Sequence, residues 1–193
     1  VSFGGTNTAL IVVDTITSVP TAATVSLLAT SSTSSDVEFS GGDVLFASDV
    51  SVSSYNDVTV EVALNSTGSL TLVADADCDG TGNFDVTSSG SVDSDATVVI
   101  DAASVSWSGS VGSSMTSLTF GVCADAAMGL GGDVSEGSQS FRLTQAEIDS
   151  MSSVAPLTFE SVSGAITVYD LTYGSNSILL DARTSGTVSV EGT

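Results

Sequence analysis

The chain has 193 residues, of which 41% are hydrophobic and 13% charged, and 23 acidic residues against two arginines give it a net charge of -21. This charge repels phosphates, so nucleic acids and anionic membranes are disfavoured partners, and no apolar run is long enough for membrane insertion. The chain has neither His nor Lys, so it lacks the commonest general base and the usual Schiff-base amine. No arrangement of the remaining groups forms a catalytic site, and we expect that the protein is not an enzyme.

The first elements in chain order are β-branched or aliphatic runs, which predict strands at 9–13, 24–29 and 37–41, with a turn around Pro20. From residue 44 onward a two-part unit recurs. An aliphatic stretch is followed by a second strand in which apolar and small polar residues alternate. The pairs are 44–47 with 50–54, 70–74 with 84–88, 98–102 with 105–109, 118–122 with 128–132, and 178–182 with 188–192.

The spacing of these units predicts the fold. Val86, Trp107 and Leu130 are 21 and 23 residues apart, and Val168 and Val190 are 22 apart. Short β-rich repeats of about 20–25 residues are typical of a solenoid, whose stacked coils share one core. The sequence therefore predicts a single all-β domain over residues 1–193, a parallel β-helix. The competing fold is an antiparallel β-sandwich, which usually carries hairpin signals that are scarce here.

One segment departs from the β pattern. Thr144 followed by Glu147 is a capping box, and helix formers with an apolar face come after it. We expect a short helix at about 145–152, on an insertion between coils, with Pro156 marking the return to strand.

An acidic loop interrupts the unit that begins at residue 70. Its Asp-x-Asp-x-Asp-Gly spacing is that of calcium loops, although the usual Glu at the twelfth position is replaced by Val86. The alternative is an acidic turn that does not bind metal tightly. The predicted calcium ligands are Asp75, Asp77, Asp79, the carbonyl of Thr81, and Asp85.

Two cysteines, Cys78 and Cys123, lie in or beside coils that are two steps apart. Two steps span about 9–10 Å, which exceeds the usual Cα separation of a disulfide, but a cysteine on a loop can fold back. A bridge and two free or buried thiols both remain open, and a bridge would favour an oxidising compartment.

Asn65 begins an Asn-Ser-Thr sequon on an expected turn. It is a candidate for N-glycosylation if the cell of origin has the machinery.

The second half of the chain carries motifs in a characteristic order: GTGNFDV at 80–86, a coil ending VSWSG, LGG at 130–132, FRLTQAEIDSM at 141–151 and LTFESVSGAITV at 157–168. Over residues 65–193 this resembles the large surface β-helix proteins of the filamentous-haemagglutinin and autotransporter-adhesin type. The resemblance implies a right-handed β-helix, extracellular display and an elongated parent protein. The chain departs from that type in having no Lys and in lacking the high Asn content of many bacterial adhesins.

These observations favour an extracellular structural protein, a solenoid unit of a surface rod or filament. Unpaired strand edges at the solenoid ends would be covered by further repeats or by other copies of the chain. A second hypothesis is an adhesin module that binds glycans or host surfaces. A polysaccharide-active β-helix enzyme is the third, and it is disfavoured because no cationic cluster is present to hold an acidic polymer.

Overall fold

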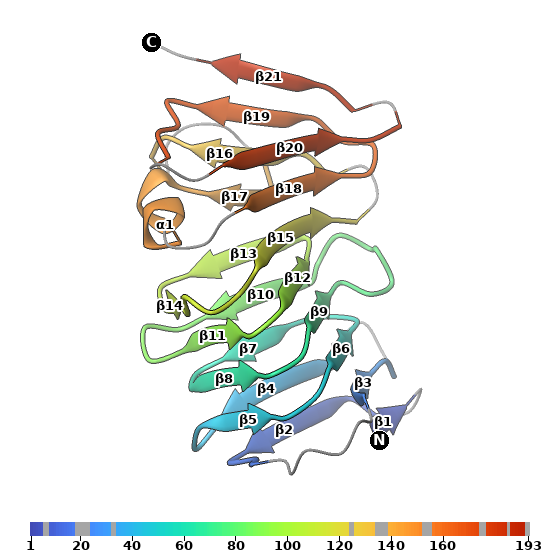
Figure 1. Cartoon of the computed structure of the whole chain (residues 1–193). Helices are drawn as coiled ribbons and strands as arrows, with labels where there is room; N and C mark the ends of the chain where they lie inside the picture. Colours follow the sequence, from blue (N-terminus) through green and yellow to red (C-terminus); the bar gives the residue numbers. More distant parts are fainter. Residues whose placement is uncertain are drawn as a thin grey trace.

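The computed structural model describes residues 1–5, 8–17, 24–31, 34–123, 126–133, 139–151, 156–173, 177–184 and 186–191. All strand pairs in these residues are parallel, and they build four sheets. The predicted all-β parallel solenoid with one short helix is confirmed, and the antiparallel sandwich is excluded (Figure 1). The predicted turn around Pro20 lies outside the described residues.

Sheet A runs the whole length of the molecule and has eight strands. Each coil contributes one strand to it, which is why the sheet is unbroken. Its strands are β1 (Ser2–Gly5), β3 (Val25–Ala29), β6 (Val50–Ser54), β9 (Leu70–Ala74), β12 (Thr97–Asp101), β15 (Ser117–Val122), β18 (Leu157–Ser161) and β20 (Ile178–Ala182).

Two further sheets accompany sheet A through the N-terminal part, so the coils there have three sides (Figure 1). Sheet B consists of β2 (Leu10–Asp14), β4 (Asp36–Ser40), β7 (Val58–Val60), β10 (Asn83–Val86) and β13 (Ser104–Trp107). Sheet C consists of β5 (Val44–Phe46), β8 (Ala63–Ser66), β11 (Ser91–Ser94) and β14 (Ser110–Val111).

The coils change shape after β14. Sheet D now faces sheet A, with β16 (Met128–Gly131), β17 (Phe141–Leu143), β19 (Ile166–Tyr169) and β21 (Val188–Glu191). β17 pairs with β16 and also contacts β13, so it lies between them although it follows β16 in the chain (Figure 1). Sheets B and D therefore form one continuous side of the solenoid.

The position of β17 corrects one step of the predicted repeat. The intervals Val86–Trp107 and Val168–Val190 are true coil steps, since these residues are paired partners. Leu130 is paired with Val168 and with Leu143, and it does not stack directly on Trp107. The 23-residue interval from Trp107 to Leu130 is therefore not a coil step, although it matches the period. β17, which comes later in the chain, lies between the strands of these two residues.

The short helix α1 spans Gln145–Ser150, within the predicted region, whose residue 152 lies outside the described part. Its capping box is formed: the Thr144 hydroxyl accepts from the Glu147 amide, and Glu147 Oε2 accepts from the Thr144 amide at 2.8 Å. Glu147 Oε1 also accepts from the Trp107 amide at 3.2 Å, which ties the helix to β13. With Ile148 and Met151 buried, the helix covers the side that sheet C leaves open beyond β14 (Figure 1).

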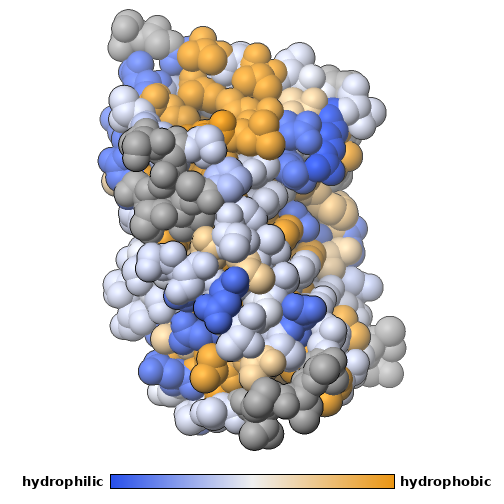
Figure 2. Space-filling model, in the orientation of Figure 1, coloured by the Kyte–Doolittle hydropathy of each residue, from blue (hydrophilic) through white to orange (hydrophobic). Residues whose placement is uncertain are grey.

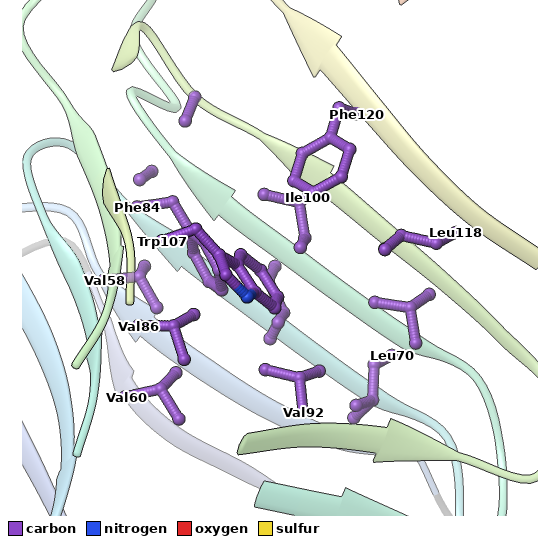
Figure 3. Packing of buried hydrophobic residues seen from close by; sticks show 14 of the residues in the cluster. Val58, Val60, Leu70, Phe84, Val86, Val92, Ile100, Trp107, Leu118 and Phe120 are labelled. Carbon is purple, nitrogen blue, oxygen red and sulfur yellow. The ribbon is translucent and has the colours of Figure 1, made fainter. Parts of the chain in front are cut away.

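The core is a set of side-chain columns that follow the strand register. Inward residues of sheet A stack from coil to coil, and the central column is Leu27, Val52, Leu72, Ile100, Phe120 and Phe159. All six are at most 2% exposed. Burying one such side chain contributes about 1.5–3 kcal/mol, so the columns supply the main driving force for stacking. Figure 3 shows Trp107 between Phe84 and Phe120, with ring centroids 6.1 and 6.0 Å away.

Serine hydroxyls form hydrogen bonds at the inward corners of the coils, where strands end. Ser66 donates to the Ser48 carbonyl and Ser94 to the Gly68 carbonyl, each at 2.6 Å. The same two hydroxyls accept from the amides of Gly68 and Ala96. A buried serine is tolerated because both its donor and its acceptor are paired.

Candidate functional site

The acidic loop between β9 and β10 brings three predicted ligands together. Carboxylate oxygens of Asp75, Asp77 and Asp79 lie within 4.8 Å of one another. Asp75 is 2% exposed, whereas Asp77 and Asp79 face solvent. Carboxylate oxygens at this separation match the hard oxygen ligands that calcium prefers, so the residues present fit such an ion.

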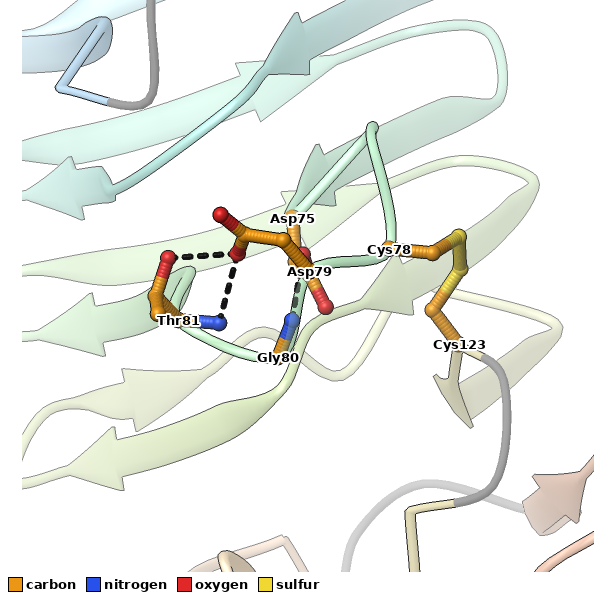
Figure 4. The surroundings of a disulfide bond; sticks show 6 residues. All are labelled: Asp75, Cys78, Asp79, Gly80, Thr81 and Cys123. Carbon is orange, nitrogen blue, oxygen red and sulfur yellow. Dashed lines mark hydrogen bonds between the residues drawn. A yellow bond between two sulfur atoms is a disulfide. The ribbon is translucent and has the colours of Figure 1, made fainter.

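Turns of left-handed backbone create this convergence. Asp75, Cys78 and Gly80 have φ values of 80°, 58° and 86°. Asp75 Oδ1 accepts from the Gly80 amide at 3.2 Å, and Asp79 Oδ1 accepts from the Thr81 amide and hydroxyl at 3.0 and 2.6 Å (Figure 4). These bonds hold two of the three carboxylates in place without a cation.

The electrostatics of the loop favour a positive charge. Burial raises the pKa of Asp75 above its usual value, and the neighbouring charges of Asp79 and Asp77 raise it further. Amide donors from Gly80 and Asp79 offset part of this rise. A bound cation would remove the repulsion among the three carboxylates.

Of the other predicted ligands, Asp85 lies outside this group, and the carbonyl of Thr81 stays a prediction. Asp85 is on β10, where its alternation with buried Phe84 and Val86 turns it to the outer face of sheet B. The charge of Asp85 raises the pKa of Asp57, which directly precedes β7 of sheet B, and Asp85 does not join the described cluster of three. The Thr81 side chain is engaged with Asp79.

A disulfide joins Cys78 to Cys123, with Cα atoms 5.3 Å apart. The strands that precede them, β9 and β15, are separated by β12, as counted from the sequence. Cys78 reaches across because it lies on the loop and not in a coil (Figure 4). The bridge fastens the acidic loop to the end of β15.

The sequon is placed differently from the expected turn. Asn65 lies within β8, paired with Leu45 and Asp93 on the outer face of sheet C, and Ser66 points inward. Asn65 is half-buried and lines a small hollow of about 110 Å³ that includes Asp93 and Asp95. The side chain nevertheless faces outward, as attachment of a sugar requires.

A larger groove of about 430 Å³, which the sequence did not predict, lies on the outer face of sheet A. It is lined by Ser53, Val73, Asp75, Ala76, Asp101, Gly121, Val122, Cys123, Glu160, Val162 and Arg183. No local motif marks these residues, because strands far apart in the sequence bring them together. Only the coil register, which aligns Val73, Asp101, Gly121 and Glu160, could have revealed it.

Comparisons of the chain with protein-family models, curated proteins and solved structures found no match. The described helix is far shorter than a bilayer-spanning helix must be.

Proposed function

We propose that the protein is a structural, non-enzymatic subunit of an extracellular rod or filament, in which copies join end to end. The observation that carries the proposal is the exposure of apolar side chains in the two end coils. Phe3 and Val190 occupy inward columns, where their paired neighbours Leu27 and Val168 are buried, yet they are 50% and 77% exposed. Figure 2 shows hydrophobic residues gathered at the upper end of the molecule, around the last coil.

The two ends have matching geometry. The first coil presents β1 of sheet A and β2 of sheet B, and the last coil presents β20 of sheet A and β21 of sheet D. Since sheets B and D form one side of the solenoid, β1 and β2 of one copy can extend β20 and β21 of another. Such a head-to-tail contact uses different surfaces on the two partners, so it propagates into a filament.

Ionic conditions should control this assembly. Each copy carries a net charge of -21, so copies repel one another at low salt. The Debye length falls from about 10 Å at 0.1 M to about 3 Å at 1 M salt, so at high salt the short-range apolar contact outweighs the repulsion between copies.

Calcium is the cofactor we propose for the cluster of Asp75, Asp77 and Asp79. With few protein ligands and two exposed carboxylates, affinity should be weak, in the range of about 10⁻⁴–10⁻³ M seen for extracellular modules. The disulfide supports an oxidising location such as the cell surface. Surface display is also what the resemblance to haemagglutinin-type β-helix proteins implies.

Complementary end variants test the assembly. Phe3→Asp blocks the first coil and Val190→Asp the last, because each places a charge on an apolar end. Analytical ultracentrifugation at 1 M NaCl should show multimers of the unaltered chain and monomers of each variant alone. A mixture of the two variants should form heterodimers and nothing larger, since one free end remains on each.

Leu45→Asp is the matched control, because Leu45 is 40% exposed but faces outward from β5 in the second coil, so it lies in neither end coil and in no inward column. It should assemble like the unaltered chain. A monomeric unaltered chain at high concentration, or equal loss of assembly in the Leu45 variant, would refute end-to-end joining.

A further inference from the structure

The outer groove of sheet A follows the solenoid axis. Its floor is one outward column in register across five consecutive strands, namely Ser53, Val73, Asp101, Gly121 and Glu160. Four strand spacings make this column about 19 Å long. The disulfide-tied residues Asp75, Ala76 and Cys123 line the groove as well. The shape suits an extended segment better than a compact small molecule.

Gly121 leaves space in the floor of the groove. A Cβ atom at this position would collide with Asp101 Oδ1, so the missing side chain provides the space in which the Asp101 carboxylate lies. Asp101 is half-buried, and its carboxylate accepts no hydrogen bond from any described residue. Burial and the charge of Glu160 raise its pKa, and Arg183 lowers it. The Asp101 carboxylate can therefore accept a hydrogen bond from a donor on a ligand.

The protein already holds one guanidinium at the end of the same column. Arg183 pairs with Glu160 at 2.7 Å and with Asp181 at 2.9 Å, and Glu160 and Asp181 are register partners. Carboxylates spaced by one strand step can thus bind a guanidinium between them. Asp101 lies in the same outward column as Glu160, two strand steps away, with Gly121 between them.

Apolar residues line the groove next to the charges. Val73, Val122 and Val162 are among its lining residues, and Val162 is 49% exposed. Long cationic side chains lay their methylene stems on apolar surface and keep the charged head on a polar partner. A groove of valines and carboxylates fits that side-chain type.

We propose that this groove binds arginine side chains of an extended segment of a partner protein, with Asp101 receiving a guanidinium. The segment lies along the column from Ser53 to Glu160, with its stems on the valines. Guanidinium matches carboxylates through paired N–H donors, which makes arginine the better fit than lysine. This inference is independent of end-to-end assembly, because the groove lies on the side of the solenoid.

Titration calorimetry with tri-arginine amide, in EDTA and 50 mM salt, tests the proposal. Tri-citrulline amide, which has the same shape without the charge, should bind at least tenfold more weakly. Asp101→Asn should weaken tri-arginine binding about fivefold, as loss of a partly buried ion pair predicts. Arg183→Gln should strengthen it about threefold, because it frees Glu160 and removes a competing cation.

Glu38→Gln is the matched control, since it removes one charge from the outer face of sheet B. It should change the affinity less than twofold. Equal weakening by the Glu38 and Asp101 substitutions would show non-specific attraction to an acidic protein and would overturn the proposal. Weaker binding by the Arg183 variant, an exposed substitution that leaves the core intact, would overturn it as well.

Discussion

The N-terminal and C-terminal parts of the solenoid enclose their hydrophobic cores in different ways. Up to β14, three sheets enclose a core of Val, Leu and Phe columns, and outward residues alternate regularly with inward ones. Beyond β14, two sheets and a helix enclose the core, and β16 and β19 are buried on both faces. In this part Phe120 lies in ring contact with both Phe141 and Phe159.

The largest expected effect falls at the junction of the two parts. Phe120 contacts Trp107 on one side and Phe159 on the other, so Phe120→Ala opens a cavity between them. We expect a loss of about 3–5 kcal/mol in the free energy of unfolding, measured in urea. Val52→Ala, in the same column of the three-sided part, should cost clearly less because fewer atoms are removed. An equal cost at the two positions would contradict the special role of the junction.

Removal of the disulfide should rank next. Cys78 and Cys123 are 45 residues apart, and closing a loop of that length is worth about 4 kcal/mol in the chain-entropy treatment. The double Cys→Ser variant should lose up to that amount in chemical denaturation under non-reducing conditions. The unaltered chain under reducing conditions should lose a similar amount. A variant as stable as the oxidised chain would show that the bridge adds nothing to the fold.

The helix cap should have a smaller and local effect. Thr144→Ala removes the hydroxyl that accepts from the Glu147 amide, which costs about 1 kcal/mol. Hydrogen exchange should rise in α1, while amides of β4 and β7 in the three-sided part keep their protection. Ser150→Ala, in the last turn, is the control, and faster exchange throughout the molecule would contradict a local role.

The calcium cluster gives the next prediction. Calcium at 1–5 mM should raise the melting temperature, because binding to the folded state alone stabilises it by RT ln(1 + [L]/Kd), about 1 kcal/mol near these concentrations. Asp77→Asn should abolish the rise, and Asp85→Asn should retain it because Asp85 lies outside the cluster. A full response from the Asp77 variant would remove this cluster as the site.

The smallest effect concerns pH. Burial raises the pKa values of Asp57, in the three-sided part, and Asp101, at the junction. A carboxyl group with a raised pKa in the folded state binds protons there more readily than in the unfolded chain, so it destabilises the fold above that pKa. The contribution of these groups to stability should therefore increase as pH falls through their folded pKa values toward the ordinary Asp pKa of the unfolded chain. In urea titrations Asp101→Asn should flatten this dependence, and an unchanged slope would contradict the assignment.

Local signals predicted elements in both parts of the solenoid, but β7, β8, β11 and β14 of the three-sided part were not predicted. Alternation in Val105–Trp107 and the capping box at Thr144 are local signals, and both led to correct elements. The place of β17 was not predictable in this way, because a three-residue strand carries no mark of which neighbours it will join. The acidic cluster was found from spacing alone, whereas the groove needed the register of Asp101, Gly121 and Glu160.

The out-of-order strand has a consequence for how the chain can be synthesised and folded. Most coils can fold one after another, each packing onto the coil synthesised before it, as the polypeptide emerges from the ribosome. β16 cannot, because the strand on which it rests, β17, is made after it. The strands from β15 to β18 must therefore fold together, after β17 has been synthesised. We expect this to be the slow step, because the other coils can fold in order from the N-terminus.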